Sequence, residues 1–322
     1  MCWRVSIMPL AGTASGRADM SAPPPERRPS LRHRAEFAAL QSVLFLAQRM
    51  PAARAERMGE RVGLAIHRLG FRLDVAHDNL RNAFPGHEEA ELRNIARRSY
   101  AHLGREMVVA LRLRGTTPQE LIERSTVDGL DAVFHAMEAG GGVVLVTGHL
   151  GNWEVGAACL AARGVAMDVV MQRQSNPLAD RTINSNRLRL GLNPIDRRRA
   201  SKLGLRTLRE GRVLGFVSDQ DARSGGVFVP FFGRAASTHR GPALLALRTG
   251  APMFAATGLR TPDGTYDCRI HPILAVREGQ PDDAVARLTA AYTAVFEDAI
   301  RLAPEQYLWQ HRRWKTRPSG PD

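Results

Sequence analysis

One histidine in this sequence stands where a general base would be expected. His149 comes two positions after an apolar run, residues 142–147, and is bracketed by Gly148 and Gly151, which allow backbone conformations closed to other residues. The apolar run predicts a strand buried on both faces. Glu154 lies five positions beyond the histidine, in the first turn of a helix that Asn152 is predicted to cap. An imidazole and a carboxylate therefore share one strand-to-helix loop.

These two side chains could work together as a base and the group that orients it. An imidazole titrates near neutral pH, and a carboxylate on its second ring nitrogen fixes its tautomer. The alternatives are a histidine that only forms hydrogen bonds and a glutamate that only supplies charge to a helix start. We favour catalysis because loops on a rigid scaffold commonly carry function. Zinc binding needs more ligands than one histidine and one glutamate supply.

Further polar side chains follow two other predicted strands. Arg173 comes after residues 166–171, where a loop guanidinium can bind a phosphate or a carboxylate in bidentate fashion. Asp219 and Asp221 come after residues 213–217, at the carboxyl end where open α/β sheets place their sites. A solvated surface charge is the alternative for the arginine, and a turn residue is the alternative for Asp221.

The elements that must position these groups alternate along the chain. From about residue 53 to residue 140 the apolar spacing is helical. Strands are then predicted at residues 142–147, 166–171, 213–217, 227–231, 252–257 and 267–273. Helices are predicted between and after them, at about 153–163, 177–190, 199–210, 240–249 and 282–302. This alternation indicates an α/β fold whose strands are joined by crossover helices.

Composition limits the class of protein and its partners. The chain has 322 residues, of which 44% are hydrophobic, so it is long and apolar enough for a sizeable core. Its net charge of +13 favours anionic partners such as lipid head groups or an acidic protein. Zinc-finger spacing and aromatic RNA motifs are absent, so we do not expect nucleic acid as a partner. Cys2, Cys159 and Cys268 lack redox or metal spacing, which favours a reducing compartment.

The ends of the chain differ from its middle. Residues 1–30 predict a disordered tail, or an upstream start codon with Met20 as the true first residue. Residues 31–52 predict a docking or membrane-anchoring helix, whose uncharged stretch at 37–47 is shorter than the roughly 20 residues that span a bilayer. Residues 53–318 are expected to form a single α/β domain together with its N-terminal helices, and 319–322 a short tail.

The histidine segment, GHLGNWE at 148–154, resembles the first motif of the lysophospholipid acyltransferase superfamily. Its H-x4-E form is similar to that of the lipid A late acyltransferases and the related mannoside-acylating enzymes. Five further blocks resemble the same branch in order: QRQSNPLADRTINSNR (172–187), SDQDAR (218–223), VFVPFFGR (227–234), THRGPALLALRTGAPM (238–253) and YLWQHRRWKTRP (307–318). The resemblance covers residues 35–318.

The resemblance implies both a fold and an activity. The fold would be that of a glycerol-3-phosphate acyltransferase, with a mixed, mostly parallel sheet flanked by helices and an N-terminal helical segment. The activity would be O-acyl transfer from acyl carrier protein to a hydroxyl of a lipid A precursor or similar anionic glycolipid. The enzyme would work at the cytoplasmic face of the bacterial inner membrane, held peripherally or by a single N-terminal anchor. This chemistry requires no metal and no organic cofactor.

The resemblance also assigns roles to individual residues. His149 would be the general base, oriented by Glu154, with the acceptor hydroxyl in the place of a triad serine. The full catalytic set would be His149, Glu154, Arg173 and Asp219. The substrate-binding set would be Asn152, Arg181, Arg187, Pro230, Gly233, Thr238 and Arg312. Within it, residues 230–233 are candidates for backbone oxyanion donors, and 227–233 for an apolar wall along the acyl chain.

Other functions stay open from the sequence. A phospholipid or mannolipid acyltransferase that uses acyl-CoA would employ the same chemistry. A basic lipid-binding protein without catalysis is the alternative of another class. The presence of His149, Glu154 and Arg173 together argues against it, since a pure binder has no use for an oriented general base. A hydrolase is disfavoured because no G-x-S-x-G motif is present. Acyl chain length, the acylated position and the oligomeric state are not fixed by the sequence.

Overall fold

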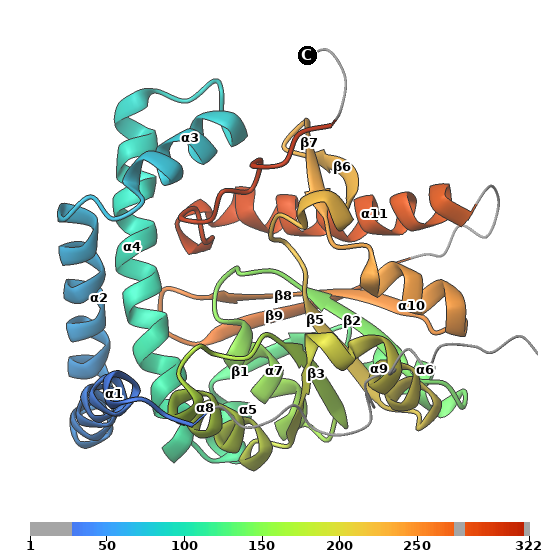
Figure 1. The fold of residues 1–322 in the computed structure, drawn as a ribbon, viewed down its shortest axis with the longest axis horizontal. Coiled ribbons are helices and arrows are strands. Elements are labelled where there is room, and N and C mark those ends of the chain that lie inside the picture. Colours follow the sequence, from blue (N-terminus) through green and yellow to red (C-terminus); the bar gives the residue numbers. More distant parts are fainter. Residues whose placement is uncertain (1–27, 274–280, 319–322) are drawn as a thin grey trace, which may run out of the picture.

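A seven-stranded sheet with helices on both faces forms the centre of the computed structural model, which describes residues 28–273 and 281–318 (Figure 1). The strand order is β1-β9-β8-β2-β5-β3-β4, and every neighbouring pair is parallel except β8 with β9. The strands are β1 (Ser125–Asp128), β2 (Val143–Thr147), β3 (Met167–Met171), β4 (Leu192–Asp196), β5 (Val213–Val217), β8 (Met253–Arg260) and β9 (Tyr266–Ile273). The expectation of a mixed, mostly parallel sheet is confirmed.

Alternate residues of the central strands pack into two different layers. On β2, Val143 and Leu145 face a core formed with α6 (Leu130–Glu138) and α7 (Trp153–Ala162). Val144 and Val146 face the larger core on the other side. That core is formed with the helices α9 (Ala200–Arg209), α10 (Gly241–Thr249) and α11 (Pro281–Leu302). Burial on both faces explains why β2 has an almost continuous apolar sequence.

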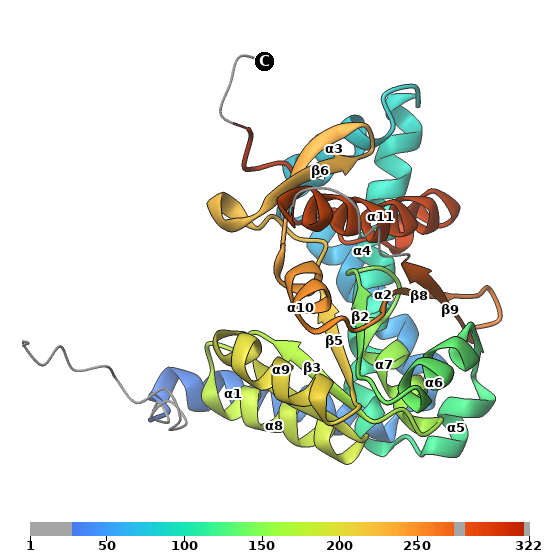
Figure 2. The same ribbon diagram turned by 90° about the vertical axis from the view of Figure 1, so that its right-hand side faces the viewer.

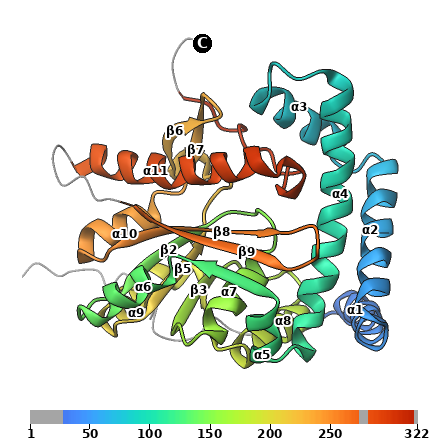
Figure 3. The ribbon, with the colours of Figure 1, turned by 180° about the vertical axis from the view of Figure 1, so that it is seen from behind.

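The N-terminal helices pack along one side of the sheet, where α2 and α4 lie side by side (Figure 3). The helices are α1 (Leu31–Arg49), α2 (Ala52–Arg68), α3 (Leu73–Ala83), α4 (Glu89–Arg112) and α5 (Pro118–Glu123). A Cβ on Gly63 of α2 would lie 1.9 Å from the carbonyl oxygen of Tyr100 on α4, so only glycine permits this approach. In the two described ranges of the chain, no helix is long and apolar enough to cross a membrane.

Helix α1 begins at a capping box formed by Ser30 and His33 and ends before Pro51, as expected for the apolar segment near the N-terminus. It packs on α8 (Pro177–Arg189), where Asn176 donates a hydrogen bond of 2.8 Å to the carbonyl oxygen of His33. Residues 1–27, which make up most of the expected N-terminal tail, lie outside the described residues, as do residues 319–322.

One predicted strand has a different place from the one expected. Residues 227–231 form β6 (Val227–Phe231), which pairs with β7 (Arg234–Thr238) in a separate antiparallel hairpin. The hairpin packs on α11, on the side of that helix away from the main sheet (Figures 1 and 2). Phe232 and Gly233 both have positive φ, 51° and 72°, as a two-residue turn of the hairpin type requires. Strands β1, β4 and β7 were not predicted.

Candidate active site

The candidate base lies where the two central strands end. His149 follows β2 and Asp219 follows β5, and because these strands are parallel neighbours, their carboxyl ends meet at one edge of the sheet. The ring Nδ1 of His149 lies 2.7 Å from Asp219 Oδ1. The backbone N–H of His149 donates to Asp219 Oδ2 at 2.9 Å. Both oxygens of one carboxylate thus hold the histidine.

This contact decides which nitrogen of His149 can act. An ionised carboxylate only accepts hydrogen bonds, so Nδ1 carries the hydrogen and Nε2 keeps its lone pair. The side-chain amide of Gln220 lies 3.4 Å from Nε2 and is the donor in this tautomer. Trp153 packs against the imidazole, with ring centroids 4.6 Å apart and planes at 66°. The histidine is therefore oriented on three sides with its basic nitrogen on the cavity side.

Asp219 is almost completely buried, with 4% of its surface exposed. Burial alone would raise the pKa of this carboxyl. The charge of His149, the hydrogen bonds from its ring and backbone, and the charge of Arg313 outweigh burial and lower the pKa of Asp219 to about 2. Asp219 is consequently ionised at neutral pH, and its negative charge stabilises an imidazolium at His149.

The loop that carries His149 is fixed by residues close to the C-terminus. The backbone N–H of Leu308 donates to the His149 carbonyl at 3.1 Å, and Gly151 N–H donates to Gln306 at 2.9 Å. Gly151 has a φ of +58°, and a Cβ there would lie 1.8 Å from the carbonyl oxygen of Gly258. Only glycine fits at this position, which explains one of the two glycines that flank the histidine in the sequence.

The expected contact between Glu154 and His149 is corrected by the structure. Glu154 instead forms a two-point ion pair with Arg187 of α8, one hydrogen bond of which measures 3.1 Å between Nε and Oε2. The first turn of α7 points Glu154 toward α8, whereas Asp219 reaches the histidine from the neighbouring strand. Glu154 and Arg187 both line the same cavity as His149, so they stay close to the site without orienting its base.

Asn152 caps α7 as expected, accepting a hydrogen bond from Val155 N–H at 3.2 Å. Its amide donates to Oε2 of the buried Glu106 at 2.9 Å. Glu106 also accepts from the hydroxyl of Tyr266 at 2.6 Å and lies 3.4 Å from Arg260. This buried polar network connects the start of α7 to α4 and to the β8–β9 pair. Asn152 lines the cavity but is itself held in place from behind.

A cavity of about 1400 Å³ opens beside His149 and changes character along its length. Near its mouth it is lined by the cationic side chains Arg197, Arg198, Arg223, Arg312 and Lys315. Its inner part runs between α7 and the sheet and is lined by the apolar side chains Leu145, Leu160, Met167, Val169, Leu192 and Ile270. Small residues make this room, namely Gly156 and Ala157 on α7 and Gly215, Ala256 and Gly258 on the strands. His149, the candidate base, lies where the two regions meet.

Arg173, predicted to be catalytic, and several residues predicted to bind substrate lie elsewhere. Arg173 pairs with Asp196 at 3.4 Å, its side chain is 45% exposed, and it does not line the cavity. Arg181 lies on the exposed side of α8. Pro230 and Gly233 lie at the exposed end of the β6–β7 hairpin, so neither their backbone nor the apolar segment 227–233 lines the cavity. The hairpin removes this segment from the sheet edge where the other loops meet.

Arg313, which lies next to Arg312 in the sequence and contacts Thr238, is a residue of the site that the sequence did not predict. Arg312 lines the cavity as expected, whereas Thr238 is fully buried and accepts a 2.6 Å hydrogen bond from Arg313. Arg313 is 1% exposed, donates to the Ser237 carbonyl at 2.8 Å and lies over the ring of Phe231. Its guanidinium is the buried cation that helps to lower the pKa of Asp219.

The rest of the C-terminal segment is equally ordered around the site. Thr316 donates to both oxygens of Asp221, at 3.2 Å from its backbone N–H and 3.0 Å from its hydroxyl. His311 Nε2 accepts from Asp221 N–H at 3.1 Å, and burial lowers the pKa of this histidine. Burial and the nearby Asp219 raise the pKa of Tyr307. The only signal for this arrangement was the aromatic and basic alternation of residues 307–317, which is also typical of a surface tail.

Metal ligands do not gather in the described parts of the chain, where no group of three or more His, Cys, Asp or Glu side chains could hold an ion. What the arrangement offers is an imidazole with a buried anionic partner, at the junction of a cationic and an apolar surface.

Comparison with known proteins adds to this geometry. Residues 25–316 match the family model described as bacterial lipid A biosynthesis acyltransferase. The chain is 31% identical to the lipid A biosynthesis lauroyltransferase of Escherichia coli K12 over 284 residues, which cover 86% of this chain and 90% of that protein. It is 30% identical to the lipid A biosynthesis palmitoleoyltransferase of the same organism, with the same coverage.

A mannolipid enzyme is also related. The phosphatidylinositol mannoside acyltransferase of Mycolicibacterium smegmatis is 28% identical over 220 residues, or 67% of this chain and 70% of that protein. The names of all three relatives describe acyltransferases, two of lipid A biosynthesis and one of phosphatidylinositol mannoside. The family model spans the whole candidate site, from the helices before the sheet to the C-terminal segment around Asp221. The chain is therefore an acyltransferase and belongs to the bacterial lipid A biosynthesis acyltransferase family.

Proposed function

We propose that this acyltransferase moves a fatty acyl group from a thioester of acyl carrier protein to a hydroxyl of a lipid A precursor or a similar phosphorylated glycolipid. The observation that carries the proposal is the position of His149 at the junction of the cationic and apolar parts of one cavity. A phosphorylated acceptor suits the first part and a fatty acyl chain the second. The names of the related lauroyl and palmitoleoyl transferases support the same reaction class.

In the proposed reaction, Nε2 of His149 removes the proton of the acceptor hydroxyl as its oxygen attacks the thioester carbonyl. The resulting tetrahedral intermediate collapses, the carbon–sulfur bond breaks, and the leaving thiolate takes the proton back from His149. An ester and a free carrier thiol are the products. Asp219 stabilises the transient imidazolium through the 2.7 Å contact with Nδ1. No acyl-enzyme is formed, because the acceptor hydroxyl is itself the nucleophile.

Gln220 is our candidate to meet the developing oxyanion. Its amide lies 3.4 Å from Nε2 of His149, next to the position that the reacting hydroxyl would take. A donor aimed at the carbonyl oxygen stabilises the intermediate more than the substrate, because the negative charge develops there. Glu154 would act at the acceptor side by holding Arg187 at the cavity wall, where a guanidinium can bind a phosphate.

The inner part of the cavity is proposed to hold the acyl chain. Its walls are apolar, and each methylene removed from water contributes about 0.8 kcal/mol to binding. A chain of a dozen carbons would then bind strongly without any polar contact. The cations at the mouth are proposed to hold the phosphates of the acceptor, so that the hydroxyl to be acylated lies beside His149.

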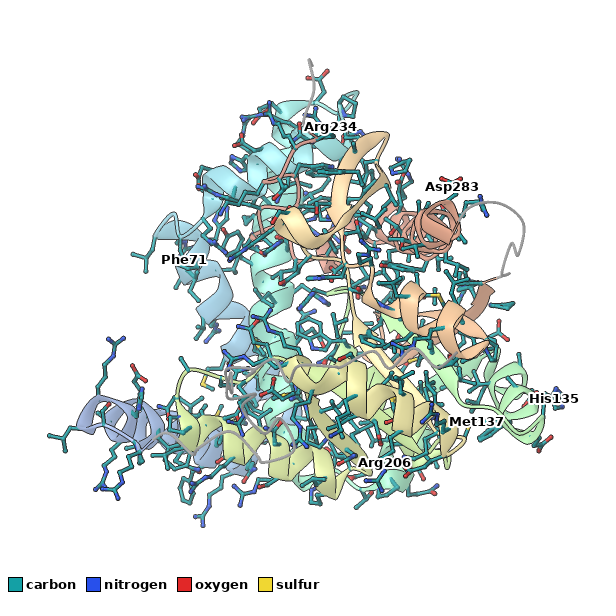
Figure 4. The ribbon with its side chains drawn as sticks, turned by 45° about the vertical axis from the view of Figure 1, so that its right-hand side comes forward. Phe71, His135, Met137, Arg206, Arg234 and Asp283 are labelled. Carbon is teal, nitrogen blue, oxygen red and sulfur yellow. The ribbon has the colours of Figure 1, made fainter. Side chains whose placement is uncertain are left out.

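Membrane contact is proposed for the outer surfaces of α1 and α2. The exposed large apolar side chains of this region are Leu31, Val43, Phe45, Leu46, Val62, Ile66, Leu69 and Phe71. Phe71 projects from the edge of the molecule (Figure 4), and Arg49 lies 4.2 Å over the ring of Phe45. Apolar side chains among arginines suit the boundary between acyl chains and anionic head groups. The enzyme would then receive its lipid acceptor at the cytoplasmic face of the inner membrane.

The test is an acyl-transfer assay with a dodecanoyl thioester of acyl carrier protein and a lipid A precursor, with phosphatidylinositol mannoside as the competing acceptor. We expect ester formation on the lipid A precursor, and loss of it in a folded His149→Ala variant. Transfer that survives in His149→Ala would refute the mechanism. Preference for the mannolipid would refute the acceptor while leaving acyl transfer intact.

A further inference from the structure

The surface beside the cavity mouth carries an unusual concentration of positive charge. Residues 197–209 contain six arginine or lysine side chains and no aspartate or glutamate. Lys202, Arg206 and Arg209 share a side of α9 at helical spacing, and Arg199, the N-cap residue of α9, continues the same spacing. We name these four side chains the α9 basic face. Among the described residues, the one ion pair on this face joins Arg206 to Glu210 at 2.6 Å, with the arginine side chain 74% exposed.

The α9 basic face surrounds a groove rather than a flat surface. A shallow depression of about 450 Å³ is lined by Arg199, Lys202, Leu203, Leu205, Arg206 and Arg209. Two partly buried leucines, Leu203 and Leu205, therefore line it together with four cations. The preceding turn, η2 (Arg197–Arg199), connects the groove to the active site, because Arg197 and Arg198 line the mouth of the cavity that contains His149.

We infer that the α9 basic face is the docking surface for the acyl donor, an acidic carrier protein that delivers its thioester into the neighbouring cavity. The inference rests on the proposed function. Charge complementarity carries it, since a face with almost no acid of its own attracts an acidic partner and speeds the encounter. The leucines would supply the apolar centre of a small contact whose rim is charged.

An anionic membrane is the other partner that a basic surface could suit, and the structure favours the carrier protein. Helices that lie on a bilayer bury large apolar side chains in it. The exposed large apolar residues of this molecule include eight on α1, α2 and their connections, and none on α9. Figure 1 places α1 and α2 at one side of the molecule and α9 near the other. A bilayer against α1 and α2 would thus leave α9 accessible to a soluble protein.

The experiment reverses charge on the α9 basic face outside the cavity. Lys202, Arg206 and Arg209 do not line the cavity with His149, and the side chain of Arg206, labelled in Figure 4, is 74% exposed. They would be changed together to glutamate, and separately to glutamine in case the charge reversal prevents folding. The matched control changes to glutamate three exposed arginines on α4 and β7, namely Arg93, Arg97 and Arg234.

Kinetics would be measured with two donors, the dodecanoyl carrier protein and dodecanoyl-pantetheine, which offers the same thioester without the protein. For the α9 variants we expect KM for the carrier protein to rise by about 10-fold or more, with kcat unchanged. The rise should diminish at high salt, because exposed charges are screened. Kinetics with dodecanoyl-pantetheine should match wild type, and the control variant should match wild type with both donors.

Three results would overturn the inference. The first is an unchanged KM for the carrier protein in both α9 variants. The second is a rise in the KM of the α9 variants for dodecanoyl-pantetheine as large as that for the carrier protein. The third is a rise in the KM of the control variant for the carrier protein as large as that of the α9 variants. Loss of binding to anionic phospholipid vesicles, with carrier kinetics intact, would assign the α9 basic face to the membrane instead. Should the wild type transfer from neither donor, the proposed function fails. Titration of the carrier protein onto wild type and the α9 variants would then still decide the docking surface.

Discussion

Replacement of Asp219 by asparagine would separate the two carboxylates that could orient His149. Asp219 accepts both the backbone N–H of His149, at 2.9 Å, and its ring Nδ1–H, at 2.7 Å. An asparagine has only one oxygen, and the backbone N–H, which cannot change, would take it. The amide nitrogen would then face Nδ1. That ring nitrogen would have to accept, which moves the hydrogen to Nε2 and removes the lone pair that acts as the base.

The expected loss follows from this change of tautomer. In serine proteases, the same substitution in the orienting aspartate lowers kcat by about 10⁴-fold. The geometry here is similar, so we expect kcat to fall by about 10³- to 10⁴-fold, or about 4 to 5.5 kcal/mol of activation free energy. Glu154→Gln is the matched comparison, since it removes one charge from the other candidate carboxylate. It should weaken the ion pair with Arg187 and affect acceptor KM more than kcat.

Single-turnover acyl transfer with saturating acceptor would measure the chemical step, and thermal unfolding would check that both variants are folded. The reasoning is refuted if Asp219→Asn keeps activity within about tenfold of wild type while Glu154→Gln loses most of it. That outcome would return the orienting role to Glu154, in line with the H-x4-E spacing. A loss in both variants at the level of kcat would mean that the ion pair with Arg187 also acts on the chemical step.

Three further predictions concern stability and specificity. Folding lowers the pKa of Asp219 from 3.8 to about 2. The wild type should therefore lose about 2 kcal/mol of unfolding free energy as the pH falls from about 4 to about 2. Denaturant titrations over this pH range should show a smaller loss in Asp219→Asn. Gly151→Ala should prevent folding or lower the unfolding free energy by about 3 kcal/mol or more, since its Cβ would lie 1.8 Å from Gly258 O. Gly140→Ala, also at positive φ but without a neighbour within 4 Å, should cost only about 1 kcal/mol. Ala256→Leu would fill the inner cavity and should shift donor preference to shorter acyl chains by about fourfold in kcat/KM for each excluded methylene, and an unchanged chain-length profile would place the acyl chain elsewhere.

The local part of the site could be predicted from the sequence because its cause is local. The strand before His149, the glycine after it and the cap at Asn152 depend on residues within a few positions of one another. Helices α7 to α11 were predicted within about two residues for the same reason. Their apolar periodicity indicates which side of each helix is buried, but it does not indicate which strand or helix packs against that side.

The partner of His149 could not be predicted in this way. Asp219 reaches the histidine because β5 lies next to β2, and strand order depends on how the crossover helices pack rather than on any short segment. Glu154 had the right spacing, but the helix turns it toward Arg187. The hairpin of β6 and β7 shows a similar limit, since its apolar sequence is equally typical of a buried parallel strand.

The pairing of the His149 loop with Gln306 and Leu308 has a consequence for folding during synthesis. The base is in the middle of the chain, while the backbone that holds its loop and the arginine behind its carboxylate arrive more than 150 positions later. During synthesis the sheet around β2 can form early, but the histidine loop stays without these supports until residues 306–316 have emerged. With His149 as the proposed base, we therefore expect acyl transfer only from chains that are nearly complete.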